Sequence, residues 1–462
     1  MKNHILLAIF ASSFVFGNIT LSSNSSSVNN TREEYVLIGW NDLGMHCANQ
    51  DFSNIAVLPP FNNVRAQLIE KIPGEMPQIR TTGFRIEYSI PGNTYSVGKT
   101  NFWQYAQDLF GLPEPLPDNI GLTGLGLAGE MALHDQYFEA VGIPNTPYTD
   151  DDLVNEQPYQ LIHLEAIDES TGALLATTDV TIPVSNEIGC VQAGCHSSET
   201  QILYEHEDED GYDPTATPIL CASCHASNAL GTTGDPEARS MSYRIHKKHR
   251  EEGPLYNINT CYKCHPGPDT QCFRGVMESG VDELMICQDC HGTMNTMYQS
   301  IDQGREPWLD EPSCGDGNCH GANYAEEPNA LFRESQGHGG MFCSACHGSP
   351  HAVYPTRVDN DNLQSISLQG HAGTLSDCAV CHTSWPGGGG PHGYSGEPFE
   401  TMGDANLDGE VNVLDIVVII GFILGQDAPD DIEFAVSDLN GDGNLDVLDI
   451  VLMVQLIIGD QL

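Results

Sequence analysis

Apolar and polar positions alternate over much of residues 33–185, and this alternation predicts β-strands. Residues 84–90 place Phe, Ile, Tyr and Ile at every second position, which is the period of a half-buried strand. Two more β-rich runs, residues 159–166 and 174–184, flank a turn that ends at Gly172, as in a hairpin. We therefore predict a mostly β N-terminal domain over residues 33–185, with a sandwich as its candidate arrangement.

A different pattern precedes this domain. Residues 5–16 form an apolar run behind Lys2, and a run of this length fits a signal peptide and is too short to span a bilayer. We predict a signal peptide at residues 1–17 and a polar linker at residues 18–32; a buried N-terminal strand is the alternative. No later apolar run reaches 18 residues, so no transmembrane segment is expected. The predicted location is extracellular or at the cell surface, with the periplasm as second choice.

From residue 186 the regular periodicity gives way to a loop-rich chain with short helices. The sequence contains 47 Gly and 27 Pro, and its hydrophobic content of 40% lies below the usual range of about 45–50%. Fifteen of the 16 Cys lie between residues 190 and 381, and fourteen of them fall in pairs. Something other than a large aliphatic core must organise residues 186–394, and a linker at residues 395–402 follows them.

Seven Cys pairs in this region are each followed directly by His. Five have the spacing C-x-x-C-H: Cys221-Ala-Ser-Cys224-His225, Cys261-Tyr-Lys-Cys264-His265, Cys287-Gln-Asp-Cys290-His291, Cys343-Ser-Ala-Cys346-His347 and Cys378-Ala-Val-Cys381-His382. Two have a longer spacer: Cys190-Val-Gln-Ala-Gly-Cys195-His196 and Cys314-Gly-Asp-Gly-Asn-Cys319-His320. We number them as motifs one to seven in chain order.

C-x-x-C-H is the attachment signature of c-type haem. The two thiols add across the haem vinyl groups, and the adjacent His is placed to bind the iron from one face. A longer spacer bulges outward and keeps the Cys-His pair, so motifs one and five are included. Zinc ribbons and redox dithiols also use C-x-x-C, but neither requires the following His. The pattern predicts seven covalent haems packed close together in residues 186–394.

The same region supplies candidate ligands for the second face of each iron. They are His206, His246, His249, His338, His351, His371 and His392, with His46 as a further candidate from the β domain. His246 and His249 stand three apart, so on a helix they would face one side and could serve two different haems. His351 follows motif six closely and is expected to reach a neighbouring haem. Surface histidines and Met ligands remain the alternatives.

With these motifs and histidines, residues 190–392 resemble the multihaem c-type cytochromes of bacterial extracellular electron transfer. The resemblance implies an electron carrier in which electrons hop between bis-His haems, with other cytochromes or extracellular acceptors as partners. None of the motifs ends in Lys, unlike the catalytic motif usual in multihaem nitrite and tetrathionate reductases, so no catalytic residue is assigned. A reductase of a small oxyanion and a subunit of a cytochrome filament are the alternative functions.

Several features are left over from these motifs. Cys47 and Cys272 are a candidate disulfide in an oxidising compartment; two buried thiols, or an iron–thiolate bond, are the alternatives. The segments 41–47 and 266–275 receive no role. Lys and Arg total 17 against 64 Asp and Glu, and the resulting net charge of −47 excludes nucleic acid as a partner.

The last 60 residues contain no Lys or Arg and hold a repeat with a period of 34 residues. Oxygen-bearing side chains occupy positions 1, 3, 5, 9 and 12 of each copy, with Gly at position 6, as in a calcium loop. The candidate ligands are Asp404, Asn406, Asp408, Asn412 and Asp415, and then Asp438, Asn440, Asp442, Asp446 and Asp449. Each loop leads into an apolar run, residues 416–424 or 450–458, which we expect to be a helix.

This duplication resembles a type I dockerin over residues 403–462. The resemblance implies a small α module that binds about two calcium ions and docks to a cohesin-like protein or a surface scaffold. The small hydroxylated residues common after position 9 of cellulosomal dockerins are replaced here by Val413-Leu414 and Val447-Leu448. An acidic solvated tail, the alternative, would not repeat its apolar positions. The whole chain is thus predicted to be a multidomain protein.

Overall fold

The computed structural model describes residues 34–459 except 187, 207–211, 252–255, 267–269, 278–284, 317–318, 322–326, 328–329, 384–385, 387–389, 394–402, 407–410, 427, 430 and 441–443. The predicted signal peptide at residues 1–17 and the predicted linkers at residues 18–32 and 395–402 lie outside the described residues. Among the residues that are described, no helix is long and apolar enough to cross a membrane.

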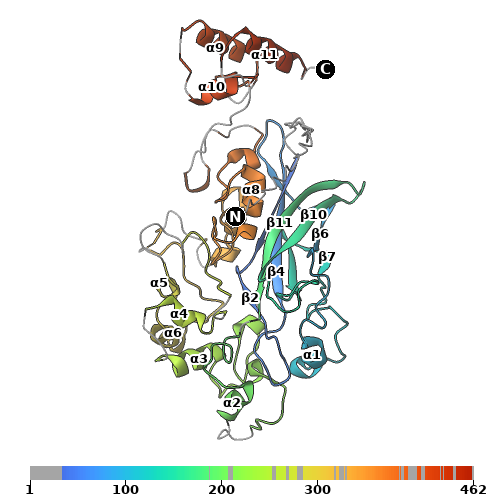
Figure 1. Ribbon diagram of the computed structural model, residues 1–462, viewed down its shortest axis with the longest axis vertical. Helices are drawn as coiled ribbons and strands as arrows, with labels where there is room; N and C mark the ends of the chain where they lie inside the picture. Colours follow the sequence, from blue (N-terminus) through green and yellow to red (C-terminus); the bar gives the residue numbers. More distant parts are fainter. Residues whose placement is uncertain are drawn as a thin grey trace, which may run out of the picture. The chain divides into compact units, whose positions relative to one another are not determined.

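Two five-stranded sheets form the N-terminal region (Figure 1). The first contains β1 (Tyr35–Asn41), β4 (Asn62–Glu70), β5 (Gln78–Arg80), β8 (Ala132–His134) and β9 (Tyr137–Ile143). The second contains β2 (His46–Cys47), β6 (Phe84–Ser89), β7 (Ala128–Glu130), β10 (Tyr159–Asp168) and β11 (Leu174–Ser185). Neighbouring strands are antiparallel except for β2 and β11, which pair in parallel.

The two sheets share one apolar core. Leu37 and Leu68 from the first sheet pack in the same buried cluster as Ile86 and Leu164 from the second. This is the arrangement of a sandwich, and it confirms the mostly β prediction for the N-terminal region. The predicted strand at residues 84–90 and the predicted hairpin are both present, as β6 and as β10–β11.

The Cys-rich region consists of short helices and loops (Figure 1). Its α-helices are α2 (Glu199–Tyr204), α3 (Met241–His249), α4 (Ile258–Tyr262), α5 (Cys287–His291), α6 (Met294–Asp302), α7 (Cys343–His347) and α8 (Asp359–Gln369). Its 3₁₀ turns are η1 (Cys221–Ser223), η2 (Asn228–Leu230), η4 (Phe332–Glu334), η5 (His338–Gly340), η6 (Cys378–Val380) and η7 (Pro391–Gly393).

The Cys-rich region packs directly on the β region at both of its ends. Near motif two, β12 (Ile219–Leu220) pairs with β3 (Ile55–Ala56), and Leu220 joins a cluster with helix α1 (Phe102–Phe110). Near motifs six and seven, Ala345 and Val380 pack in a cluster that contains residues of β1. The predicted boundary at residue 185 therefore does not separate two independent apolar cores.

A further link comes from α8, which lies against the sheets. The Gly39 N–H donates to Gln364 Oε1 at 2.7 Å, and Gln364 Nε2 donates to the Gly39 carbonyl at 3.0 Å. Gln364 is 2% exposed. A side-chain amide that satisfies both backbone groups of one residue docks the helix at a single position along β1.

The C-terminal residues form a small helical module. Its helices are α9 (Val413–Ile423), α10 (Asp431–Ser437) and α11 (Val447–Gly459), and its core contains Ala405, Ile419 and Met453. Two of these helices confirm the prediction from the apolar runs. Helix α9 begins three residues earlier than predicted, because the Asn412 side chain accepts the Leu414 N–H and caps the helix there.

Candidate metal centres

Each Cys-Cys-His motif closes on itself through the backbone. In motifs two, three and seven the His N–H donates to the carbonyl of the first Cys at 2.9–3.0 Å, and in motifs four and six the same five residues form α5 and α7. In the long motifs, His196 donates to the Cys190 carbonyl at 3.1 Å and His320 to that of Cys314 at 3.2 Å. The longer spacer thus keeps the same hydrogen bond between the His N–H and the carbonyl of the first Cys.

Six motif histidines each face a histidine from outside the motifs. The ring centroids are 6.1 or 6.2 Å apart in all six pairs: His196 with His249, His225 with His206, His265 with His246, His291 with His351, His347 with His392, and His382 with His338. The angle between the rings varies from 12° to 78°. The feature common to these pairs is therefore their spacing and not a stacking geometry.

This spacing fits one metal ion held between two imidazoles. A metal–imidazole bond is about 2 Å long, so two rings bound on opposite sides of one ion have centres about 6.3 Å apart. In each pair, the motif His follows directly after a Cys pair in the chain. The residues present therefore fit a c-type haem, which the two Cys and the paired histidines would hold.

Several of these rings are held in the tautomer that a metal requires. His246 Nδ1 donates to the Ser242 carbonyl at 2.7 Å, and His249 Nδ1 donates to the Ile245 carbonyl at 2.9 Å. His225 Nδ1 donates to the Arg239 carbonyl at 2.8 Å. Because a carbonyl only accepts, Nδ1 carries the proton and the Nε2 lone pair remains available for a metal.

Burial keeps the central histidines neutral. Burial, followed by neighbouring charges, lowers the pKa of His265, His291 and His351 to about 4. Burial also lowers the pKa of His246 and His347. A neutral imidazole is the form that binds iron, since protonation occupies the lone pair.

Two of the predicted second ligands are not brought to a motif. His46 is buried, but its Nε2 lies 2.8 Å from Asp42 Oδ1, so the usual ligand atom faces a carboxylate in the β region. His371 is exposed, and its Nδ1 lies 3.2 Å from the carbonyl of the next residue, Ala372. The structure therefore does not support either as an iron ligand.

The candidate disulfide is not formed either. Among the described residues, no disulfide links Cys47 to Cys272. Cys47 lies on β2 beside Ser185 of β11. Burial, followed by the nearby Cys287 thiol, raises the pKa of Cys272 to about 11, which places Cys272 beside motif four.

The first three motifs are neighbours in space. Helix α3 carries both His246, which faces motif three, and His249, which faces motif one. A Cβ added at Gly189, directly before motif one, would lie 2.5 Å from the Lys263 carbonyl of motif three. His206 follows α2, just after motif one, and faces His225 of motif two.

The remaining motifs continue this series. Gln288 Nε2 of motif four donates to the Asn257 carbonyl beside motif three at 2.8 Å. The segment that links motif six to His351 reaches motif four, because His351 faces His291. Motifs six and seven exchange facing histidines: His338 precedes motif six and faces His382, and His392 follows motif seven and faces His347.

Motif five also lies in this group. Burial, followed by the nearby thiol of Cys319, raises the pKa of Cys290 in motif four. The pKa of His347 in motif six is lowered, mainly by burial and then by the charges of His392 and His320. Both effects require His320 and Cys319 to stand close to motifs four and six. The seven motifs therefore form one continuous group.

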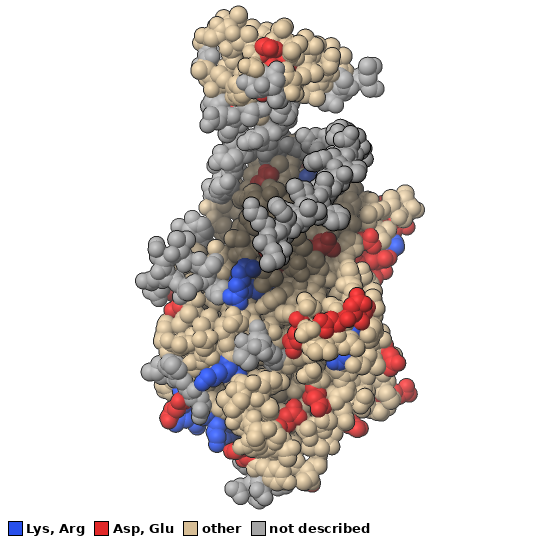
Figure 2. Space-filling view, in the orientation of Figure 1, with Lys and Arg blue, Asp and Glu red and all other residues tan. Residues whose placement is uncertain are grey.

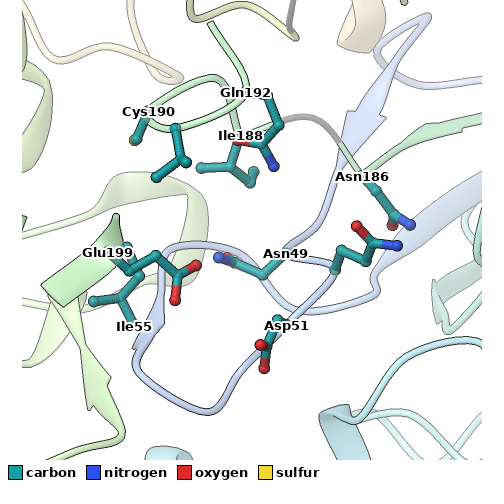
Figure 3. A pocket seen from close by; sticks show the side chains of 10 residues that line it. Asn49, Asp51, Ile55, Asn186, Ile188, Cys190, Gln192 and Glu199 are labelled. Atoms are coloured by element: carbon teal, nitrogen blue, oxygen red, sulfur yellow. The ribbon is translucent and has the colours of Figure 1, made fainter. Parts of the chain in front are cut away.

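A small polar pocket lies beside motif one (Figure 3). Its lining includes Cys190, Glu199, Asp51 and the amide side chains of Asn49 and Asn186. The Oδ1 of Asn49 accepts the N–H groups of Val57 and Leu58, so its amide nitrogen is directed toward the pocket, where Figure 3 shows it facing Glu199.

The C-terminal repeat places one carboxylate at the same position in each copy. Asp415 accepts the Asn406 N–H at 3.1 Å and the Asn412 N–H at 2.8 Å, and both Asp415 and Asp449 are 0% exposed. Asp449 accepts the Asn440 N–H at 3.3 Å and the Asp446 N–H at 2.9 Å. The two copies thus fold alike around a buried anion.

The centre of each loop is not described. Asp408 and Asp442, the predicted ligands at position 5, lie outside the described residues. Within the described ranges, no group of three or more His, Cys, Asp and Glu side chains is gathered as for a metal ion. Asp404 is 1% exposed and stands with Asp415 in the first copy of the repeat. Buried carboxylates of this kind require compensation by a cation or by donors.

One family model matches the chain. It is the Dockerin type I domain, and it matches residues 402–458. No curated protein and no solved structure matches. The match coincides with the duplicated loops and with helices α9, α10 and α11, and it confirms the dockerin part of the resemblance. Residues 402–458 are therefore a type I dockerin domain.

Proposed function

We propose that this protein is an exported seven-haem c-type cytochrome that carries electrons by hopping from haem to haem. The six His–His pairs at 6.1–6.2 Å are the observation that carries the proposal. A packed core would bring side-chain rings into contact, whereas these pairs keep the separation that a bis-ligated iron needs. The group bound at each motif would supply a reversible one-electron couple.

The chain's own residues would prepare each site for electron transfer. The Cys pairs fix the group covalently, and the motif His binds one face of the iron. The second His fills the opposite face at motifs one, two, three, four, six and seven, which leaves no position for a substrate there. Backbone carbonyls hold the ring protons on Nδ1 and so fix the ring orientation. These features favour a carrier over a reductase.

The order of the motifs in space supports transfer along the whole group. Contacts connect motif two to one, one to three, three to four, four to six, and six to seven. Side chains three residues apart on a helix have Cβ atoms about 5–6 Å apart, so His246 and His249 would hold two irons as near neighbours. In all six pairs both histidines belong to one chain, so no exchange between copies is needed.

Positively charged side chains gather on the side of the proposed haem region. Figure 2 shows Lys and Arg gathered mainly on the side of the Cys-rich helices, whereas Asp and Glu spread over the rest of the visible face. Lys247 and Lys248 lie exposed near the C-terminal end of α3, next to the two ligand histidines. Cations there would offset haem carboxylates in a chain of net charge −47.

The dockerin domain would attach the cytochrome to a cohesin-like scaffold. Its two long helices expose the same apolar positions 34 residues apart: Val413 and Val447 at 64% each, Leu414 and Leu448 at 56% and 54%, and Val417 and Val451 at 62% and 48%. Apolar patches of this kind on a soluble domain mark an interaction surface. A partner with an apolar docking face, outside the cell, would bring the haems to extracellular acceptors or to other cytochromes.

The proposal predicts seven covalent haems. Intact-mass analysis of the mature protein should give the chain plus seven haem groups, and Cys190→Ser combined with Cys195→Ser should remove one of them. The physical reason is that motif one closes like the short motifs, with the His returned to the first Cys. A mass with five haems, both long motifs being empty, would contradict the proposal for motifs one and five.

The proposal also predicts two separable haems on α3. His246→Ala and His249→Ala should each convert one low-spin haem to high spin, because each substitution removes one imidazole from a different iron. Electron paramagnetic resonance of the oxidised protein measures the change, and the double variant should show two high-spin equivalents. His371→Ala, at the exposed histidine, is the matched control and should add no high-spin signal to that of the wild-type protein. Equal spectra for all three variants would exclude this ligand assignment.

A further inference from the structure

Two sequence segments without an assigned role meet around one residue, His351. Residues 41–47 contact Ser349 and Pro350, the two residues directly before it. The N–H groups of Arg274 and Gly275 both donate to the His351 carbonyl, at 2.9 and 3.1 Å. The backbone at this histidine is therefore held by two different parts of the chain.

Residues 41–47 also fix the chain just before His351. Ser349 Oγ donates to the Asn41 carbonyl at 2.7 Å. Gly44 has a φ of +81°, and a Cβ added there would lie only 2.1 Å from the Pro350 carbonyl oxygen. No residue other than glycine fits this approach, because the added carbon would displace Pro350 and with it His351.

The loop itself is rigid. The Asn41 side chain accepts the N–H groups of Leu43 at 3.1 Å and of Gly44 at 2.7 Å, and its own amide donates to Asn62 Oδ1 at 2.8 Å. The guanidinium of Arg274, which is 1% exposed, donates to the Gly44 carbonyl. Asn41 is thus anchored to β4 through Asn62, and the Gly44 carbonyl is anchored by the buried Arg274 guanidinium.

The conformation of His351 shows why such anchoring is needed. Its φ is +64°, a region that non-glycine residues adopt only when the surrounding structure imposes it. The ring nevertheless stands 6.2 Å from His291, the same spacing as in the other five pairs. A strained backbone that delivers a ring to this position is a feature of a functional site and not of ordinary packing.

We propose that residues 41–47, together with Arg274 and Gly275, are a positioning element that holds His351 as the second iron ligand at motif four. This rests on the proposed haem function and adds a specific role for the β region. The element sets the direction of the ring, and the orientation of this ligand would tune the reduction potential of one haem among seven.

The test compares Gly44→Ala with Gly172→Ala in the full chain. Gly172 has a similar φ of +71° but has nothing within 4 Å of an added Cβ, so it controls for backbone strain alone. In Gly44→Ala we expect seven haems by mass and one high-spin equivalent by electron paramagnetic resonance, as in His351→Ala. Gly172→Ala should add no high-spin signal to that of the wild-type protein.

The outcomes separate this proposal from the proposed function. Absence of haem from the wild-type protein would remove the function and the positioning element together. Seven haems in Gly44→Ala with the spin states and potentials of the wild-type protein would overturn the positioning element alone. If Gly44→Ala does not fold, Ser349→Ala decides: a shift in the potential of one haem supports the element, and an unchanged titration of all seven overturns it.

Discussion

Removal of calcium is expected to unfold the dockerin domain while the β sheets stay folded. Asp404, Asp415 and Asp449 are at most 1% exposed, and residues 403–462 contain no Lys or Arg that could neutralise them. Buried carboxylates without a counter-charge cost several kcal/mol each, roughly, so the apo form loses its structure. Metal binding and folding of this domain are therefore one process.

The measurement is limited proteolysis of the full-length protein with and without a chelator. With calcium, α9 and α11 should resist cleavage; after chelation, cleavage should move into residues 413–459 and be reversed by added calcium. Asp415→Asn combined with Asp449→Asn removes the repeated buried anion, and this variant should no longer respond to the chelator. An unchanged pattern after chelation of the wild-type protein would show that the fold does not depend on the ion.

Local pattern was sufficient to predict the elements whose partners are near in sequence. Strand β6 follows from the alternation Phe84, Ile86, Tyr88, and the β10–β11 hairpin from two β-rich runs around a turn. For His246 and His249, three residues apart, we expected one shared face if the segment is helical; the structure forms α3 there and places each opposite a different motif. The dockerin repeat was visible because each copy carries its own ligand pattern.

Features that depend on long-range packing were not predictable from the sequence. The pairing of His351 with His291 and of His338 with His382 depends on how loops return across the molecule, and no periodicity encodes that path. The same holds for Gln364, whose amide binds Gly39 across 325 residues of sequence. His46 looked like a ligand beside Cys47, but only the fold shows that Asp42 occupies its Nε2.

The buried Arg274 was missed for the same reason, although its segment stood out as unexplained. Its partner Asp361 lies 87 residues away on α8, so no local spacing connects them. The only signal in the sequence was an arginine beside an unpaired cysteine in a region with few cations. This shows that unexplained segments in a repetitive chain are useful places to look for structural anchors.

Replacement of Arg274 by Met is expected to destabilise the protein by about 3–5 kcal/mol, the usual cost of leaving a buried charge without its partner. Arg274 Nε and Nη2 donate to the two oxygens of Asp361 at 2.6 and 2.9 Å, and the guanidinium lies over the Tyr159 ring at 4.8 Å. Both side chains of the pair are at most 4% exposed. Loss of the arginine leaves the buried Asp361 carboxylate without a counter-charge.

Urea denaturation followed by circular dichroism measures this effect. Arg85→Met, which breaks an exposed Arg–Glu pair with side chains 33% and 42% exposed, is the matched control and should change stability little because solvent screens that pair. Adding Asp361→Leu to Arg274→Met should recover part of the loss, since the isolated charge is removed while the Gly44 and Cys272 carbonyls still lack their donor. Equal stability of the Arg274→Met and Arg85→Met variants would show that the buried pair does not anchor the Cys-rich region to the sheets.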